Sequence, residues 1–299
     1  MAISNVSVMK NKPTVAGIGE LLWDVLPTGK QVGGAPCNFA FHAMQAGCES
    51  YVVSAVGNDL LGDEMVKNLG KLNLETRYIQ RNQYPTGTVT VKLNEYGQPS
   101  YIIHENTAWD NILPTPEILR KSGECRAVCF GSLGQRSSVS ASTILQVLES
   151  VKSGCLKVFD INLRQHFYSP EIITKSLEFA DVLKLNDEEL PVLTGLYGLT
   201  GEVKNQIKQL VNLFNLQYVV CTMGEKGSII MGHNEFSFLE SPKVVVADTV
   251  GAGDSFTAVL VAGLLHNVEL KKIHEKATQV AAFVCTQRGA TPLIPFEIF

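Results

Sequence analysis

The 299-residue sequence predicts an α/β fold, in which helices cover both faces of a mostly parallel central sheet. Short apolar runs of strand length alternate with amphipathic helical patterns along nearly the whole chain. With 45% apolar residues, a chain of this length can bury a large core. No linker, internal repeat or low-complexity tract marks a boundary, so we predict one domain over residues 1–299.

The predicted strands and helices alternate in chain order. Buried strands are predicted at residues 15–19, 51–56, 127–130, 158–161, 182–185 and 218–222. Helices are predicted at residues 36–45, 60–71, 139–152, 170–179, 203–214, 254–266 and 271–286. Ligands of such sheets bind beyond the carboxyl ends of the strands, so we expect the functional site at that edge.

Two segments depart from this alternation. Residues 86–104 alternate apolar and polar side chains around a glycine-containing turn at residues 94–97, which predicts an antiparallel hairpin. A second hairpin is predicted from residues 227–232 and 235–239.

Charge and composition exclude several classes of partner. The net charge is -4, and Lys271-Lys272 is the densest basic run. The sequence therefore predicts no positively charged surface that would attract nucleic acid or an anionic membrane. No apolar run approaches the roughly 20 residues of a membrane span, and the polar first 12 residues lack a signal core, so we expect a cytoplasmic protein. The seven cysteines include no Cys-x-x-Cys pair and are expected to be reduced thiols.

The most informative segment is residues 248–254, Asp-Thr-Val-Gly-Ala-Gly-Asp, which leads into an apolar helical pattern. The first turn of a helix has unpaired N–H groups, and glycines let another atom approach the backbone, so this turn can bind an anion. Asp254 beside it can accept a proton, and we expect it at the exposed helix terminus, where the dipole favours its charged form. The alternative is that Asp254 only caps the helix.

Residues 248–256 resemble the second signature of the ribokinase-like sugar kinases, a family that includes ribokinase, fructokinase, adenosine kinase and ketodeoxygluconate kinase. The resemblance implies that Asp254 is the catalytic base on the acceptor hydroxyl. It assigns the anion hole for the phosphoryl group to Gly251, Ala252 and Gly253. It also implies a ribokinase-like fold, in which a small β-sheet lid from about residues 27–34 and 84–108 covers the sugar.

Two motifs are assigned to the sugar. Residues 33–38 resemble the first family signature, which implies that Gly33, Gly34 and Asn38 contact sugar hydroxyls; a tight turn before a helix is the alternative. Residues 19–24 resemble the Gly-Glu-x-x-x-Asp opening of fructokinases, which assigns Asp24 to two neighbouring hydroxyls. A solvated loop acid is the alternative for Asp24.

Two further motifs are assigned to ATP and magnesium. Asn186 and Glu189 resemble the family's Asn-x-x-Glu motif, which would hold the magnesium on the ATP phosphates through water. Acids that complement a helix dipole are the alternative. Thr222, Gly224 and Gly227 resemble the Thr-x-Gly-x-x-Gly turn that meets the nucleotide in this family. Such turns are common, so this signal is weak by itself.

The remaining site assignments concern two charged residues. Residues 160–164 resemble the family's Asp-Pro-Asn-x-Arg string, with Ile161 in place of proline. Because of this difference, the resemblance does not predict the backbone path of the loop. Arg164 could steady the transferred phosphate, or it could form a surface salt bridge. By analogy with related enzymes, Asp248 could help to place a potassium ion.

Together these motifs predict an ATP-dependent sugar kinase that phosphorylates a primary hydroxyl of a small sugar, with fructose as the leading acceptor. The alternatives are a ketodeoxygluconate or other sugar kinase and a nucleoside kinase; residues 104–110 contain no arginine for a sugar acid, which favours a neutral sugar. A non-catalytic sugar or nucleotide sensor is the alternative of a different class. The expected cofactors are ATP, Mg²⁺ and K⁺, and two chains could pair through the edges of the lid.

Overall fold

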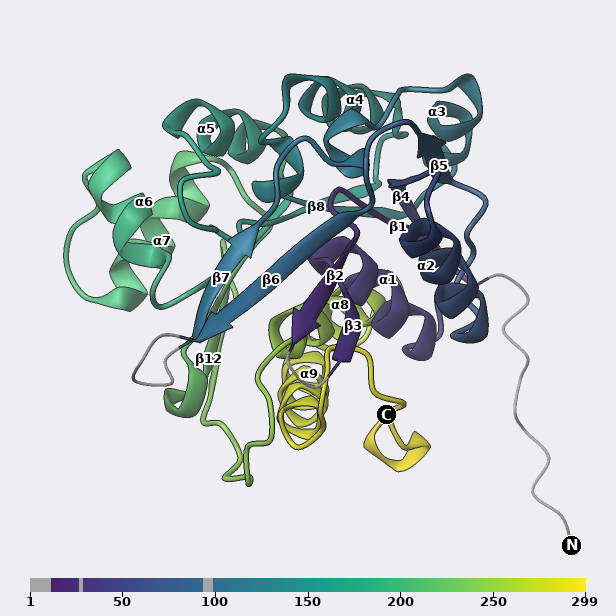
Figure 1. The fold of residues 1–299 in the computed structure, drawn as a ribbon. Helices are drawn as coiled ribbons and strands as arrows, with labels where there is room; N and C mark the ends of the chain where they lie inside the picture. Colours follow the sequence, from purple (N-terminus) through teal and green to yellow (C-terminus); the bar gives the residue numbers. More distant parts are fainter. Residues whose placement is uncertain (1–11, 27–28, 94–98) are drawn as a thin grey trace, which may run out of the picture.

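The computed structural model describes residues 12–26, 29–93 and 99–299 (Figure 1). Its main sheet has nine strands in the order β13-β12-β11-β10-β9-β8-β1-β4-β5. These strands are β1 (Thr14–Ile18), β4 (Glu49–Gly57), β5 (Ile79–Asn82), β8 (Ala127–Gly131), β9 (Leu156–Asp160), β10 (Val182–Asn186), β11 (Tyr218–Thr222), β12 (Ser228–Gly232) and β13 (Phe236–Leu239). The pairs from β5 to β11 are parallel, and only β12 and β13 join antiparallel. The predicted mostly parallel sheet is confirmed.

Helices cover both faces of this sheet, as predicted (Figure 1). One face carries α3 (Pro116–Ser122), α4 (Ser138–Ser150), α5 (Pro170–Phe179), α6 (Leu190–Tyr197) and α7 (Val203–Leu213). The other carries α1 (Ala35–Gln45), α2 (Leu60–Lys71), α8 (Ala252–Leu265) and α9 (Leu270–Cys285). The seven predicted helices all form, whereas the short α3 and α6 and the edge strand β5 were not predicted.

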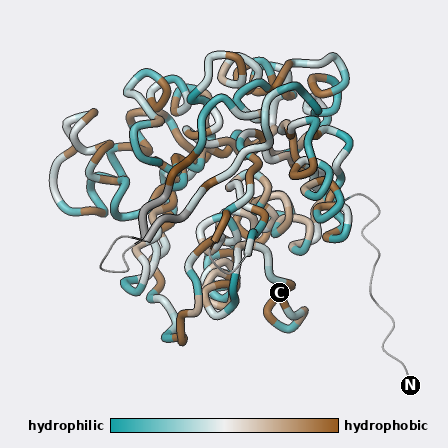
Figure 2. The backbone as a smooth tube through the Cα atoms, viewed as in Figure 1, coloured by the Kyte–Doolittle hydropathy of each residue, from teal (hydrophilic) through white to brown (hydrophobic). Residues whose placement is uncertain are grey.

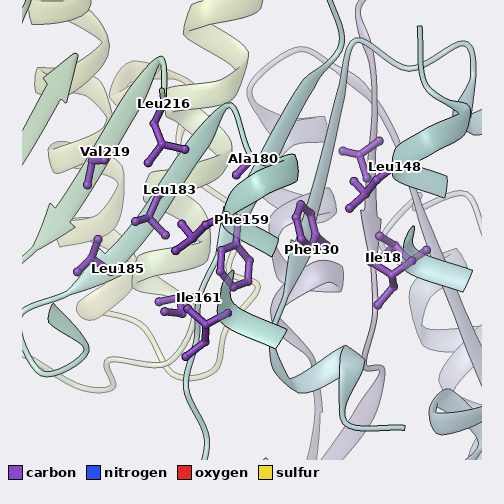
Figure 3. Packing of buried hydrophobic residues seen from close by; sticks show 14 of the residues in the cluster. Ile18, Phe130, Leu148, Phe159, Ile161, Ala180, Leu183, Leu185, Leu216 and Val219 are labelled. Carbon is purple, nitrogen blue, oxygen red and sulfur yellow. The ribbon is translucent and has the colours of Figure 1, made fainter. Parts of the chain in front are cut away.

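The larger core cluster lies between the sheet and helices α3 to α7. Figure 3 shows its centre, where the rings of Phe130 and Phe159 from neighbouring strands stack with centroids 5.3 Å apart. Leu183 and Leu185 continue this apolar layer along β10. The strands are buried on both faces, which explains why they read as continuous apolar runs rather than alternating ones.

Hydrophilic and hydrophobic residues alternate along the outer helices (Figure 2), because only one stripe of each helix faces the sheet. Helix α8 differs, since every residue from Ser255 to Ala262 is buried. It contacts α1 on one side and α9 on another. The burial of residues 255–262 therefore holds the first turn of α8 in a fixed position. Among the described residues, no helix is long and apolar enough to span a membrane.

A separate four-stranded sheet has the order β3-β2-β6-β7. It consists of β2 (Leu22–Leu26), β3 (Gly29–Gly33), β6 (Gly87–Leu93) and β7 (Pro99–Ile103). Strands β6 and β7 form the predicted hairpin; its turn at residues 94–97, and residues 27–28 of the predicted lid, lie outside the described residues. Strand β2 was not predicted, and a solvated loop was the alternative weighed for Asp24. The strand places Asp24 in this small sheet rather than in a solvated loop.

Candidate active site

The predicted site residues gather where the carboxyl ends of neighbouring strands meet the first turn of α8. Asp160 ends β9, Asn186 ends β10 and Thr222 ends β11, and these three strands are adjacent in the sheet. This edge is where ligands of parallel sheets bind. Asp254 lies in the first turn of α8, and Lys184 on β10 lies beside the backbone of that turn.

The first turn of α8 presents bare backbone. Gly251 precedes the helix with a φ of 82°, in the left-handed region, and a Cβ there would lie 2.4 Å from the Ala290 oxygen. A Cβ on Gly253 would lie 2.7 Å from Nζ of Lys184. Gly251 is therefore required for its conformation and its closeness to the main chain of Ala290, and Gly253 leaves room for the close approach of the lysine.

Asp254 is the third residue of α8, and its side chain is half-buried. It does not cap the helix, because Gly251 is the N-cap residue and no side-chain cap bond forms. Instead its Oδ2 accepts a hydrogen bond of 2.8 Å from Nδ2 of Asn38. The residues that resemble the two family signatures thus meet across 216 positions of sequence.

The expectation that the helix terminus would favour the charged form of Asp254 is wrong. Burial and the nearby Asp160 carboxylate raise the pKa of Asp254 to about 6. The hydrogen bond from Asn38 and the charges of Lys184 and Arg164 oppose this rise. The loss of water around the carboxylate outweighs the helix dipole, whose contribution at one terminus is small.

The residues assigned to the sugar lie together. A Cβ on Gly33 would lie 2.3 Å from Oδ2 of Asp24, so this glycine leaves room for the carboxylate. Gly34 has a φ of 116° and precedes α1, and Asn38 faces Asp254 from that helix. Oδ1 of Asn38 is buried and has no hydrogen-bond partner among the described residues. Such an acceptor is available for a sugar hydroxyl.

Asp24 lies on β2 in the small sheet and is partly buried. Burial and the charge of Asp248 raise its pKa to about 6, and the charge of Arg164 lowers it. The pKa of Asp24 in the small sheet thus responds to the charge of Asp248, which lies before α8 in the chain.

Glu20, the glutamate of the Gly-Glu-x-x-x-Asp string, was not among the predicted site residues. It is 1% exposed, and its Oε1 accepts a hydrogen bond of 3.3 Å from the main chain of Ala35. Its Oε2 is buried without a partner in the described part of the chain. Burial raises the pKa of Glu20 to about 7, and Asp254 adds to the rise. The sequence feature that could have indicated a role for Glu20 is its place directly after the predicted strand at residues 15–19.

The two residues assigned to magnesium are held by main-chain groups. The carboxylate of Glu189, 5% exposed, accepts hydrogen bonds of 2.9 Å from the main-chain nitrogens of Leu163 and Asn186. Oδ1 of Asn186 accepts from the nitrogens of Glu188 and Glu189. Each carboxylate oxygen of Glu189 accepts one of these bonds and keeps further acceptor capacity, so Glu189 fits a metal held through water, whereas Oδ1 of Asn186 already accepts two bonds. Within residues 12–26, 29–93 and 99–299, no His, Cys, Asp and Glu side chains group to bind a metal directly.

The residues assigned to the nucleotide lie in the turn after β11. The Thr222 hydroxyl is 3.5 Å from the Leu185 oxygen. Gly224 and Gly227 have φ values of 54° and 106°, which favour glycine. A Cβ on Gly227 would lie 2.1 Å from the Leu239 oxygen of the second hairpin, so this glycine joins the turn to β13.

Arg164 and Asp248 lie at the periphery. Arg164 is exposed and donates a hydrogen bond of 3.1 Å to the oxygen of Leu163, and it makes no ion pair within the described residues. Its charge nevertheless lowers the pKa values of Asp24 and Asp254. The two carboxylate oxygens of Asp248 accept bonds of 3.1 Å from the nitrogens of Val250 and Gly289.

The chain is similar to known kinases over nearly its full length. The family model described as pfkB family carbohydrate kinase matches residues 17–297. A fructokinase of Klebsiella pneumoniae is 28% identical over 300 residues, which cover 94% of this chain and 95% of that protein.

Two solved structures share the fold. The crystal structure of an uncharacterized sugar kinase from Pyrococcus horikoshii in complex with ATP has a TM-score of 0.77, 28% identity and coverage of 93% and 94% of the two chains. Fructokinase from Vibrio cholerae, with fructose, ADP and calcium bound, has a TM-score of 0.79, 25% identity and coverage of 95% and 96%. With its family match and its ribokinase-like fold, this chain belongs to the pfkB family of carbohydrate kinases.

Proposed function

We propose that this carbohydrate kinase transfers the γ-phosphoryl group of ATP to a primary hydroxyl of fructose. The observation that carries the proposal is the bond of 2.8 Å between Asn38 and Asp254. The bond joins the Asp254 carboxylate to a residue assigned to the sugar, and Asp254 directly follows the bare backbone of Gly251 to Gly253, which supports the proposed role of Asp254 as the base. A hydroxyl bound beside Asn38 would therefore lie next to both a base and an anion hole.

In the proposed reaction, Asp254 accepts the proton of the sugar hydroxyl as that oxygen bonds to the γ-phosphorus and the bond to the β-phosphate oxygen breaks. The pKa of about 6 suits this role, because most of the carboxylate is ionised at pH 7 while it remains more basic than an ordinary aspartate. The main-chain N–H groups of the Gly251 to Gly253 turn stabilise the charge on the phosphoryl oxygens.

Magnesium, when bound with ATP, supplies charge neutralisation on the phosphates, and Asn186 and Glu189 would hold its water shell. The main-chain hydrogen bonds described above fix both side chains at the end of β10. Thr222 and the two glycines of the following turn would meet the nucleotide from the next strand. We also propose that exposed Arg164 steadies the transferred phosphoryl group as the lid closes.

Fructose is proposed as the acceptor for two reasons. Relatives over nearly the full chain are named fructokinase, and the Vibrio cholerae structure holds fructose. Two cations of the lid region whose side chains the structure describes are already paired. Lys30 of β3 forms an ion pair with Glu64, and Arg136 bonds to both carboxylate oxygens of Asp110 at 2.7 and 2.8 Å. Their charges are already neutralised, which favours an uncharged sugar.

The test is a coupled assay of ADP release with fructose, ribose, ketodeoxygluconate, fructose 6-phosphate and adenosine as acceptors. We expect fructose to give the highest kcat/KM, and the Asp254→Asn variant to lose several orders of magnitude in kcat while its affinity for ATP changes little. Turnover by Asp254→Asn at the rate of the unchanged protein would remove the proposed base. Selective turnover of another acceptor would replace fructose, and ligand binding without turnover would indicate a sensor.

Two secondary proposals have their own tests. The fixed carboxylate of Asp248 supports a nearby monovalent cation, and equal rates in potassium and tetramethylammonium buffers would contradict it. Pairing of two chains through the edges of the four-stranded lid would give a dimer mass in light scattering. A monomer mass at working concentration would contradict that pairing.

A further inference from the structure

We propose that Lys184 is a positioning residue for phosphoryl transfer: its buried ammonium group supports the anion hole from behind and holds the first turn of α8 in place. This inference rests on the proposed function, in which that turn receives the phosphoryl group. Neither the motif assignments nor the comparisons give Lys184 a role. The evidence is its burial, its charged neighbours and its contact with Gly253.

The ammonium group of Lys184 is almost fully enclosed. The residue is 7% exposed, and its Nζ lies 3.3 Å from Oδ1 of Asp160, which is 4% exposed. The other carboxylate oxygen of Asp160 accepts a hydrogen bond of 3.4 Å from the hydroxyl of Thr257 on α8. The pair thus connects the end of the sheet to the helix that carries Asp254.

Nζ of Lys184 lies close to the main chain of Gly253, which is part of the proposed anion hole. A Cβ on Gly253 would lie 2.7 Å from Nζ, so the absence of a side chain there lets the ammonium group approach the backbone of the turn. In the proposed function the main-chain N–H groups of this turn bind the phosphoryl group, and the positive charge of Lys184 beside the turn adds to their field. In a site with little water, such a fixed charge acts strongly on a developing negative charge.

The stability of the fold does not explain this lysine. Burying an ion pair costs the hydration of both charges, and apolar residues of similar size commonly stabilise a core at least as well. The other residues of β10 are Val182, Leu183, Leu185 and Asn186, so Lys184 is the one charged residue of a strand that ends at the site. A charge kept at this cost is best explained by its effect on the neighbouring turn.

One departure from the family pattern adds a main-chain contact between the segments that carry Lys184 and Asp160. Ile161 stands where the family usually has proline, and its main-chain nitrogen donates a hydrogen bond of 3.0 Å to the oxygen of Lys184. Proline has no N–H group and could not make this bond. The bond aligns the residues directly after Asp160 with Lys184, so in this chain the main chain as well as the side chains joins the two strands at this point.

The test uses Lys184→Met, with Lys157→Met on neighbouring β9 as a matched control because Lys157 lies near the opposite end of its strand. We expect Lys184→Met to lower kcat by about tenfold to a hundredfold, with the KM for the sugar changed by less than about twofold. The control should keep both values. A kcat of Lys184→Met equal to that of the control would overturn the proposal.

A double variant separates this role from simple structural support. Lys184→Met should lower the melting temperature because it leaves Asp160 buried and unpaired, and adding Asp160→Asn should restore much of that loss. We expect the double variant to stay slow, because the cation is still missing. Recovery of kcat together with the melting temperature would show a structural role only and would overturn the proposal.

A binding measurement keeps this inference distinct from the choice of substrate. We expect Lys184→Met to bind ADP and magnesium normally, but to bind ADP with tetrafluoroaluminate, a mimic of the transferred phosphoryl group, about tenfold more weakly by calorimetry. Equal affinity for the mimic would overturn the role of Lys184. If instead the unchanged protein phosphorylates no acceptor but shows this difference in binding, the proposed function is wrong and the support of the anion hole by Lys184 stands.

Discussion

Replacing Asp254 by asparagine should abolish turnover and at the same time stabilise the folded protein. The folded state raises the pKa of Asp254 from 3.8 to about 6, mainly by burial. An acid with a raised pKa costs no stability below its unfolded pKa, because both states are then protonated. The cost grows between pH 3.8 and 6 and is complete above pH 6. Asparagine has no such cost, and its side-chain oxygen can still accept the bond from Asn38.

The size of the gain follows from the difference between the two pKa values. About two pKa units correspond to about 3 kcal/mol, so Asp254→Asn should raise the free energy of unfolding by about that amount at pH 8 and by about half of it at pH 5. The assay is urea unfolding of both proteins at the two pH values. Asp63→Asn is the control, since its side chain is 70% exposed and a change below about 0.5 kcal/mol is expected. A gain that is absent at pH 8, or no larger at pH 8 than at pH 5, would refute the reasoning.

Three further changes test individual contacts. Asn38→Leu removes a bond that favours the ionised form of Asp254, so the acidic limb of the kcat/KM profile should move about one unit to higher pH, and an unmoved limb would contradict that bond. Gly33→Ala places a Cβ 2.3 Å from the Asp24 carboxylate, so the KM for the sugar should rise severalfold while the KM for ATP stays constant. Unchanged sugar KM would show that Asp24 does not bind the acceptor. Gly195→Ala, in α6 with no atom within 4 Å of the new Cβ, should stabilise the protein by about 1 kcal/mol, and a lower melting temperature would contradict the open space there.

The central strands and the longer helices could be predicted from the sequence because their pattern is local. In the strand at residues 218–222 the three central residues are apolar and buried because the sheet is covered on both faces, and this leaves a local signal in the sequence. Short elements lack such a signal. Strand β2 contains Trp23 and Asp24 side by side, and its pairing with β3 and β6 is decided by segments elsewhere in the chain.

The site was predicted as a set of separate motifs, and the structure adds the contacts between them. Glycines at positions 251 and 253 were expected to leave bare backbone, and the φ of 82° at Gly251 agrees with that reading. Arg136 was missed because its position beneath the lid depends on Asp110, 26 residues away in the chain. Lys184 was assigned no role from the sequence, because only its approach to Gly253 in the fold gives it a place in the site.

The sequence by itself determined the order of strands and helices, the glycine turn before α8 and the kinds of side chain available for chemistry. These properties depend on hydrophobic period and backbone freedom, which are local. Only the tertiary structure decided that Asn38 meets Asp254, that Glu20 is buried with an unpaired oxygen, and that Asp254 is less acidic than a helix terminus alone would make it. The physical reason is that desolvation and charge interactions depend on distances between residues far apart in the chain, and folding sets those distances.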